Sequence, residues 1–230
     1  MTSAPPAVPG VLLDLDGTIM DSQEGILQTM RHTLQAVGCD VPSDDELFPW
    51  IGPPFPSSLR RWTTLDDAGI ERAVIEYRSY YDEVGEHLSR PFARMVELLH
   101  DFGDRGVTLA LATSKPRSQA LRMLERAGVL HRFSATGAAS DDEKRGTKSE
   151  VIEDALGELA ENGIDTSGFA MVGDRIHDIE AAREHGLIPV AVAWGYGNSS
   201  EWAHADHTVE SPEQLRDFIL NGSVAVSVRH

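Results

Sequence analysis

Two carboxylates separated by one residue follow a short apolar run near the start of the chain. Residues 11–13 read Val-Leu-Leu and predict a buried strand, and Asp14, Asp16 and Gly17 come directly after it. Like charges at the end of a buried strand repel each other and are costly to desolvate unless a cation compensates them. Oxygen ligands of this kind suit Mg²⁺, and a carboxylate can also attack phosphorus. The pattern indicates metal-assisted phosphoryl chemistry, although an acidic strand end before a turn has the same local sequence.

Two later segments carry groups that would bind a phosphate. Residues 109–116 (LALATSKP) form an apolar run that ends in hydroxyls, with Thr113 and Lys115 near its end. Residues 146–149 (GTKS) place Lys148 at the start of a helical pattern. Hydroxyl groups donate hydrogen bonds to phosphoryl oxygens, and a lysine supplies a point positive charge.

A third segment returns to carboxylates. Residues 171–178 (MVGDRIHD) run from an apolar strand into a turn that carries Asp174 and Asp178. The two aspartates are four residues apart at a helix start, so they can share one face of the helix. Arg175 and His177 lie between them, and an exposed helix start explains them as well as a role near the substrate.

The elements that would position these groups alternate between helix and strand after residue 90. Such alternation predicts an α/β fold with a parallel sheet covered on both faces, and ligands of such sheets bind outside the carboxyl ends of the strands. Asp14, Thr113 and Asp174 all follow predicted strands, so we expect them to meet in one crevice. The predicted strands are 11–13, 107–112, 133–136, 169–172 and 188–193, and the predicted helices are 91–102, 116–127, 148–160, 176–185 and 212–220.

The segment between the first strand and residue 90 has no strand signal. Asp21 and Ser22 are candidate caps for a helix that ends at Gly38, prolines break residues 48–56 into a loop or short turns, and residues 66–88 predict a second helix. We therefore expect an α/β core over residues 1–20 and 91–222, an inserted helical domain over 21–90, and a loosely ordered tail over 223–230.

Composition narrows the class of protein. The 230 residues are 41% hydrophobic, and no apolar run approaches the ~20 residues of a membrane-spanning helix. Residues 1–10 are rich in Pro and Ala without a basic stretch, so we expect a short disordered leader and no signal peptide. The single cysteine, Cys39, fits a reducing cytoplasm.

The net charge of −17 argues against two classes of partner. Neither a nucleic acid polymer nor an anionic membrane attracts so acidic a chain. A small phosphate ester remains compatible with it, because a metal ion and a few basic groups can act locally. We expect a monomer or a weak homodimer.

Taken in order, the four segments resemble the signature motifs of the haloacid dehalogenase-like superfamily of phosphohydrolases, over roughly residues 10–220. The resemblance implies a Rossmann-like doubly wound parallel sheet, with a small all-helical cap domain inserted after the first strand. It also implies a Mg²⁺-dependent phosphatase. Asp14 is then the nucleophile, and Asp16 protonates the leaving alcohol and later activates water. Mg²⁺ is held by a carboxylate oxygen of Asp14, the backbone carbonyl of Asp16 and the side chain of Asp174.

The resemblance assigns the remaining polar residues to the phosphoryl group. Thr113 would bind a phosphoryl oxygen, although a hydroxyl here is also a common helix cap. Substrate contacts would also come from Gly17, Lys115 and the backbone amide of Ser114.

Lys148 would bridge the nucleophile and the phosphoryl group. Lys144 and Arg145 compete for this role, but Lys148 directly precedes the apolar helix pattern. Asp178 would support the waters of the metal or its loop.

Several residues bear on which substrate the protein would accept. Asp16 favours phosphate esters over carbon–halogen cleavage, and residues 23–30 lack the histidine that sugar-phosphate mutases of this type carry there. Residues 51–54, 173–178 and 194–197 are similar to those of 5′-nucleotidase-like bacterial proteins. Phosphoglycolate phosphatase, pyrophosphatase, a mutase and a non-catalytic binding protein are the alternatives. Trp50 and Phe55 would either stack on a base or pack the cap.

Overall fold

The computed structural model describes residues 5–53, 55–142 and 144–223. The chain forms two compact units, which we call the core unit (Met1–Ile19 with Pro91–His230) and the helical unit (Met20–Arg90). The boundaries between the two units lie after Ile19 and after Arg90.

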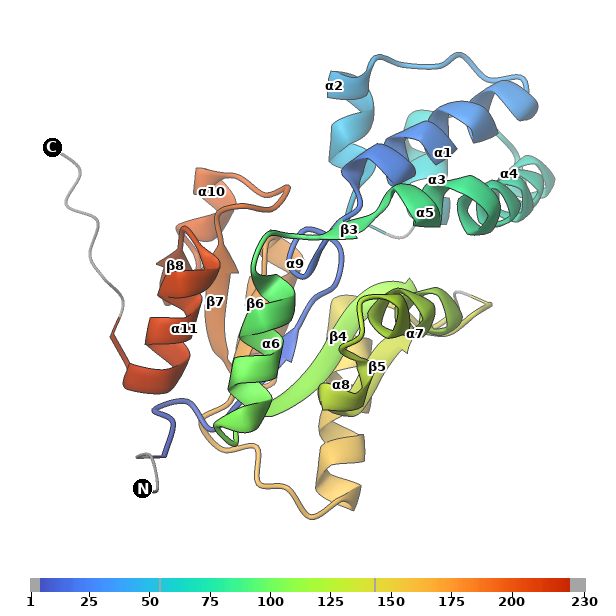
Figure 1. The fold of residues 1–230 in the computed structure, drawn as a ribbon. Coiled ribbons are helices and arrows are strands. Elements are labelled where there is room, and N and C mark those ends of the chain that lie inside the picture. Colours follow the sequence, from blue (N-terminus) through green and yellow to red (C-terminus); the bar gives the residue numbers. More distant parts are fainter. Residues whose placement is uncertain (1–4, 54, 143, 224–230) are drawn as a thin grey trace, which may run out of the picture. The chain divides into compact units, whose positions relative to one another are not determined.

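The core unit is built on a six-stranded sheet with the strand order β5-β4-β1-β6-β7-β8 (Figure 1). Every neighbouring pair is parallel, so the predicted α/β parallel sheet is confirmed. The chain lays β4 and β5 on one side of β1 and the later strands on the other, which is the topology of a ligand-binding crevice. The strands are β1 (Gly10–Leu13), β4 (Thr108–Pro116), β5 (Phe133–Ala139), β6 (Ala170–Gly173), β7 (Ile188–Val192) and β8 (His207–Val209).

Helices cover both faces of this sheet. Behind it in Figure 1, α8 and α9 bury a cluster that includes Leu12, Met171, Val151 and Ala182, while α6, α7 and α11 lie in front. The sheet is therefore doubly wound, with helices on both of its faces. The helices are α6 (Met95–Asp104), α7 (Arg117–Arg126), the 3₁₀ turn η3 (Leu130–Arg132), α8 (Lys148–Glu161), α9 (Ile176–Glu184), α10 (Ser199–Trp202) and α11 (Pro212–Asn221).

Two expectations for the core unit are wrong. Pro91 does not start a helix, because it belongs to β3 (Arg90–Pro91), which pairs with β2 (Met20–Asp21), and α6 begins only after Arg94 with its left-handed φ of 67°. The leader is not disordered at residues 7–10. The amides of Ala7 and Val8 donate hydrogen bonds to the end of α11, and Gly10 already belongs to β1.

Several short elements of the core unit were not predicted. β8 and η3 have three residues each and α10 has four, so these elements are too short for a hydrophobic pattern to repeat. Of the predicted tail, Gly222 ends α11 in a left-handed conformation (φ 69°), and residues 224–230 lie outside the described residues.

Among the described residues of the helical unit, the regular elements other than β2 and Arg90 of β3 are helices and helical turns. Its first long helix and the helical stretch at its end match the pattern over residues 22–37 and 66–88. The prediction of a loop or short turns over 48–56 fits the 3₁₀ turn at Phe48–Trp50 but is wrong at its end, because α3 begins at Phe55 and a proline in the first turn needs no backbone N–H. The elements are α1 (Gln23–Ala36), α2 (Asp44–Leu47), the 3₁₀ turn η1 (Phe48–Trp50), α3 (Phe55–Trp62), α4 (Asp67–Tyr80), the π-helical turn η2 (Tyr81–Gly85) and α5 (Glu86–Leu88).

The two aromatic residues of the proline stretch pack inside the helical unit. Trp50 is buried and stacks on Trp62 with ring centroids 5.1 Å apart, and Phe55 packs on Tyr77 at 4.3 Å. Within residues 5–53, 55–142 and 144–223, no helix combines the length and the apolar character that crossing a membrane requires.

Candidate active site

Strand register places the motif aspartates at one edge of the sheet. Leu13 of β1 pairs with Leu111 of β4 and with Val172 of β6. Asp14 and Asp174 lie directly beyond these pairs, and the amide of Asp14 donates to the carbonyl of Val172 at 3.0 Å. The crevice at the carboxyl ends of β1 and β6 therefore collects both carboxylates.

Three buried carboxylates form the centre of this crevice. One oxygen each of Asp14, Asp174 and Asp178 lies within 4.8 Å of the others. Among the described residues, no hydrogen-bond donor reaches the buried Oδ1 of Asp174. Burial and the neighbouring charges of Asp178 and Asp14 raise the pKa of Asp174. A hard divalent cation fits these residues, because it supplies the charge and the partner that this oxygen lacks.

Lys148 contacts two of the three carboxylates of this cluster. Its Nζ lies 2.7 Å from Asp14 Oδ1 and 2.9 Å from Asp178 Oδ1, and it donates to the carbonyl of Ala112 at 3.0 Å. Burial works against the ammonium charge, but the two carboxylates outweigh it and raise the pKa of Lys148. The lysine is therefore charged at every physiological pH.

The two basic residues that compete with Lys148 in sequence lie elsewhere. Lys144 is exposed and pairs with Asp142, while Arg145 binds Asp154 and Glu153 on the surface of α8. Lys148 starts α8, where Thr147 caps the helix by accepting from the amide of residue 150. That cap directs the first residue of the helix toward the sheet edge.

Asp14 has an unusual protonation equilibrium. Burial raises the pKa of its carboxyl to about 6, with Lys148 opposing the shift and Asp178 and Asp16 adding to it. The carboxylate form predominates above that pH, so near neutrality Asp14 is an ionised and desolvated group, which is the state that a carboxylate nucleophile requires.

Asp16 and Lys115 form an ion pair beside the cluster. Lys115 Nζ donates to the two carboxylate oxygens of Asp16 at 3.0 and 3.3 Å. Thr113 is buried, and its hydroxyl accepts from the amide of Lys115 at 3.2 Å instead of capping α7, whose N-cap position is Pro116. Thr113 also lies inside β4 and not beyond it, because β4 continues along β5 after its pairing with β1 ends. Ser114 lies between Thr113 and Lys115 in β4.

Glycines enclose Asp174 on two sides. Gly17 has a φ of 82°, and a Cβ on it would lie 2.4 Å from Asp174 Oδ2. A Cβ on Gly195 would lie 2.3 Å from the Cβ of Asp174 and 2.3 Å from the carbonyl oxygen of Gly17. Only residues without a side chain fit this close to the carboxylate.

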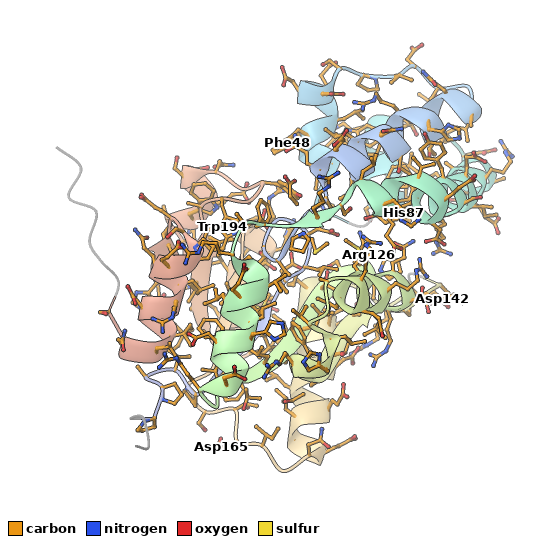
Figure 2. The ribbon with its side chains drawn as sticks, in the orientation of Figure 1. Phe48, His87, Arg126, Asp142, Asp165 and Trp194 are labelled. Carbon is orange, nitrogen blue, oxygen red and sulfur yellow. The ribbon has the colours of Figure 1, made fainter. Side chains whose placement is uncertain are left out.

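The loop after β7 supports the site, which sequence reasoning missed. The amide of Tyr196 donates to Asp174 Oδ2 at 2.6 Å, and the indole of Trp194, labelled in Figure 2, donates to the carbonyl of Thr18 at 3.1 Å. The sequence signal for these contacts is the pair of glycines at residues 195 and 197 after a strand. Glycines at these positions allow two loops to approach each other closely.

Asp178, near the start of α9, contacts both the backbone of its own loop and Lys148. Its Oδ2 accepts from the amide of Arg175 at 3.0 Å, and its Oδ1 contacts Lys148. A Cβ on Gly173 would lie 2.2 Å from its Cγ, so this carboxylate packs directly on β6. Arg175 pairs with Glu201, and His177 is exposed.

Known proteins are similar to this chain in fold and in sequence. Residues 11–192 match the family described as haloacid dehalogenase-like hydrolase. A predicted phosphatase from Clostridium acetobutylicum superposes with a TM-score of 0.84 at 29% identity, over 92% of this chain and 98% of that one.

Three curated relatives are similar in sequence. The tyrosine-protein kinase PtkA of Mycobacterium tuberculosis is 38% identical over 82% of this chain, which spans only 63% of the length of PtkA. A 5′-nucleotidase of Pseudomonas aeruginosa is 33% identical over 84% of this chain and 86% of its own length. A phosphoglycolate phosphatase of Agrobacterium fabrum is 32% identical over 85% and 84%. The resemblance to the haloacid dehalogenase-like superfamily is therefore confirmed, and the chain belongs to the haloacid dehalogenase-like hydrolases.

Proposed function

We propose that this protein is a Mg²⁺-dependent phosphatase that hydrolyses a small phosphate monoester through an aspartyl-phosphate. The observation that carries the proposal is the burial of Asp14 against Lys148 and beside Asp174 and Asp178. A desolvated carboxylate held by a lysine has the properties of a nucleophile toward phosphorus.

Two aspartates divide the chemistry. Asp14 forms a bond from its carboxylate oxygen to phosphorus while the bond to the leaving oxygen breaks, and Asp16 gives its proton to that oxygen. Asp16 then takes a proton from water as the water oxygen attacks phosphorus, which releases phosphate and restores Asp14. Lys148 balances the charge on Asp14 and on the transferred phosphoryl group.

Thr113 and its neighbours would receive the phosphoryl oxygens. The hydroxyl of Thr113 and the amide of Ser114 are donors in β4, Gly17 leaves room for the substrate beside Asp16, and Lys115 adds a positive charge. The ion pair between Lys115 and Asp16 holds the acid–base carboxylate in place before the substrate arrives.

Mg²⁺ would be held by Asp14, by Asp174 and by the backbone carbonyl of Asp16, with Asp178 supporting its waters. When bound, it neutralises charge on the phosphoryl oxygens. The buried Asp174 Oδ1 without a donor supports this assignment.

The proposed substrate is a nucleoside 5′-monophosphate. The similarity to the 5′-nucleotidase of P. aeruginosa supports this choice, since that alignment covers most of both chains. Phosphoglycolate and pyrophosphate are the alternatives within the same chemistry. We propose that the helical unit is the cap that selects among them. The single cysteine and the acidic charge support a cytoplasmic protein, and we propose a monomer or a weak homodimer, which sedimentation would test.

A second candidate function is phosphoryl transfer from a nucleoside triphosphate to a tyrosine hydroxyl. The 38% identity to PtkA favours it over other transferase activities. The same nucleophile and lysine would serve both functions. The phosphoryl donor would be a monoester in one case and a nucleoside triphosphate in the other, and the acceptor would be water or tyrosine.

Phosphate release from a panel of esters, with and without Mg²⁺, tests the proposal. The panel contains nucleoside 5′-monophosphates, phosphoglycolate, sugar phosphates and pyrophosphate, and a parallel reaction contains ATP and a tyrosine peptide. We expect Mg²⁺-dependent release from the nucleotides and none from the Asp14→Asn variant. Phosphotyrosine formation without phosphate release would instead support the kinase function, and inactivity toward every substrate would contradict both.

A further inference from the structure

The segment after β7 forms hydrogen bonds with the loop that carries Asp174. The indole Nε1 of Trp202 donates to the backbone carbonyl of Asp174 at 2.9 Å, while the amide of Tyr196 holds the carboxylate. A Cβ on Gly197 would lie 1.9 Å from the same carbonyl oxygen and 2.6 Å from the indole nitrogen. The segment therefore contacts both the main chain and the side chain of one residue.

Glu201 holds the next two residues of that loop. Its Oε2 accepts from the amide of Ile176 at 2.8 Å and from Nε of Arg175 at 3.1 Å. The side chains of Arg175 and Glu201 are only 16% and 15% exposed, so solvent screens this pair weakly. Ile176 starts α9, so its amide has no partner inside the helix, and Glu201 supplies one.

Glu201 is itself held in place. Its Oε1 accepts from Nδ2 of Asn198 at 2.7 Å, and the side-chain oxygen of Asn198 accepts from the amides of residues 200 and 201. These contacts fix the rotamer of Glu201 before it meets α9. The turn that contains α10 is thus a rigid support, although it is only four residues long.

We infer that Glu201 and Trp202 are positioning residues that orient Asp174 as a ligand for Mg²⁺, an inference that rests on the proposed function. Tyr196 occupies Asp174 Oδ2, which leaves Oδ1 for the cation. The direction of Oδ1 depends on the backbone of residues 174–176. Trp202 and Glu201 hold that backbone through their hydrogen bonds. Outer partners of this kind change metal affinity or activity by about 10–100-fold when they are removed.

Isothermal titration of the full chain with Mg²⁺ alone tests the inference, using Glu201→Ala, Glu201→Gln and Trp202→Phe. We expect the Mg²⁺ dissociation constant to rise about 10-fold for Glu201→Ala and for Trp202→Phe. Glu201→Gln should have a smaller effect, because its amide oxygen still accepts from the amide of Ile176. This graded rescue distinguishes positioning from a general loss of structure.

Two control variants match these changes. Glu213 lies in the first turn of α11 and pairs with Arg94 at 2.9 Å, so Glu213→Ala removes a glutamate–arginine pair, more exposed than that of Glu201, away from Asp174. Trp62→Phe removes an indole N–H from the helical unit. Both should leave the dissociation constant for Mg²⁺ unchanged within about 2-fold.

Thermal unfolding of each variant accompanies the titration. Lower stability with wild-type Mg²⁺ affinity in Glu201→Ala and Trp202→Phe would overturn the inference and leave the proposed function standing. If Glu201→Ala does not fold, then Glu201→Gln and Trp202→Phe decide the result. Absence of Mg²⁺ binding to the wild-type protein would overturn the proposed metal site and this inference together.

Discussion

Lys148 Nζ lies 2.7 Å from Asp14 Oδ1, and both side chains are almost fully buried. The same ammonium group contacts Asp178, and Asp174 completes the group of carboxylates. Three carboxylates facing one ammonium leave two negative charges uncompensated when all four groups are ionised. A divalent cation would balance that excess, so these carboxylates either take up protons or bind a metal ion.

Replacement of Asp14 by Asn should abolish turnover without loss of the fold. The amide has nearly the shape of the carboxylate but cannot attack phosphorus, so we expect a loss of at least about 1,000-fold in kcat. Phosphate release and circular dichroism measure the two properties. Asp165→Asn, an exposed change in a loop, is the matched control and should keep full activity. Activity near that of the wild type in Asp14→Asn would refute the assignment of the nucleophile.

Removal of the charge on Lys148 should destabilise the protein strongly. Lys148→Met leaves Asp14 and Asp178 buried without their cation, which costs about 3–5 kcal/mol in the free energy of unfolding. Urea denaturation at neutral pH without Mg²⁺ measures this loss.

The exposed Lys144 provides the control for that change. Its side chain is 84% exposed, so Lys144→Met should shift the free energy of unfolding by less than about 0.5 kcal/mol. Equal effects of the two substitutions would show that the ion pairs of Lys148 do not stabilise the fold.

The contribution of Asp14 to stability without metal should fall as the pH rises through the acid range. The pKa of Asp14 is about 6 in the folded protein, above the ordinary value of 3.8. A raised pKa means that the folded state holds the proton more tightly, so the contribution is complete below pH 3.8 and is lost by about pH 6, on the order of 3 kcal/mol. The difference in free energy of unfolding between the wild type and Asp14→Asn, measured across this range, isolates the effect. A difference that does not change with pH would contradict it.

Mg²⁺ should reverse this pH dependence. The cation binds the ionised carboxylates, so protons compete with it. We expect Mg²⁺ to raise the melting temperature more at pH 7.5 than at pH 5, and to have no effect on Asp174→Ala. An equal rise at the two pH values would show that the cation binds other groups.

A methyl group on Gly195 should disturb the metal site. The added Cβ would meet the Cβ of Asp174 and the carbonyl oxygen of Gly17, both at 2.3 Å, and one of the two loops must move. We expect Gly195→Ala to weaken Mg²⁺ binding at least about 10-fold, as measured by titration calorimetry.

Gly157 in α8 is the control for that substitution. A Cβ on Gly157 meets nothing within 4 Å, so Gly157→Ala should stabilise the helix by about 0.5–1 kcal/mol and leave Mg²⁺ affinity unchanged. Unchanged affinity in Gly195→Ala would mean that the loop after β7 adapts without moving Asp174.

Local patterns were sufficient for most of the fold and for the identity of the motifs. Apolar runs mark β1, β6 and β7, helical periodicity marks α1 and α8, and Asp14 and Asp174 directly follow strands. Parallel strands bring their carboxyl ends to one edge, so the meeting of these two aspartates follows from topology alone. Short elements such as β8 contain too few residues for a hydrophobic pattern to repeat and could not be found in this way.

The sequence by itself determined the parallel sheet, the helical insertion and the positions of the motif carboxylates, because hydrophobic periodicity and residue order are local properties of the chain. Only the tertiary structure decided that Lys148 and not Lys144 reaches Asp14, and that residues 195–202 support Asp174. These contacts join residues that lie far apart in the chain. Burial and distance between such residues depend on how the strands and loops pack, which no local pattern encodes.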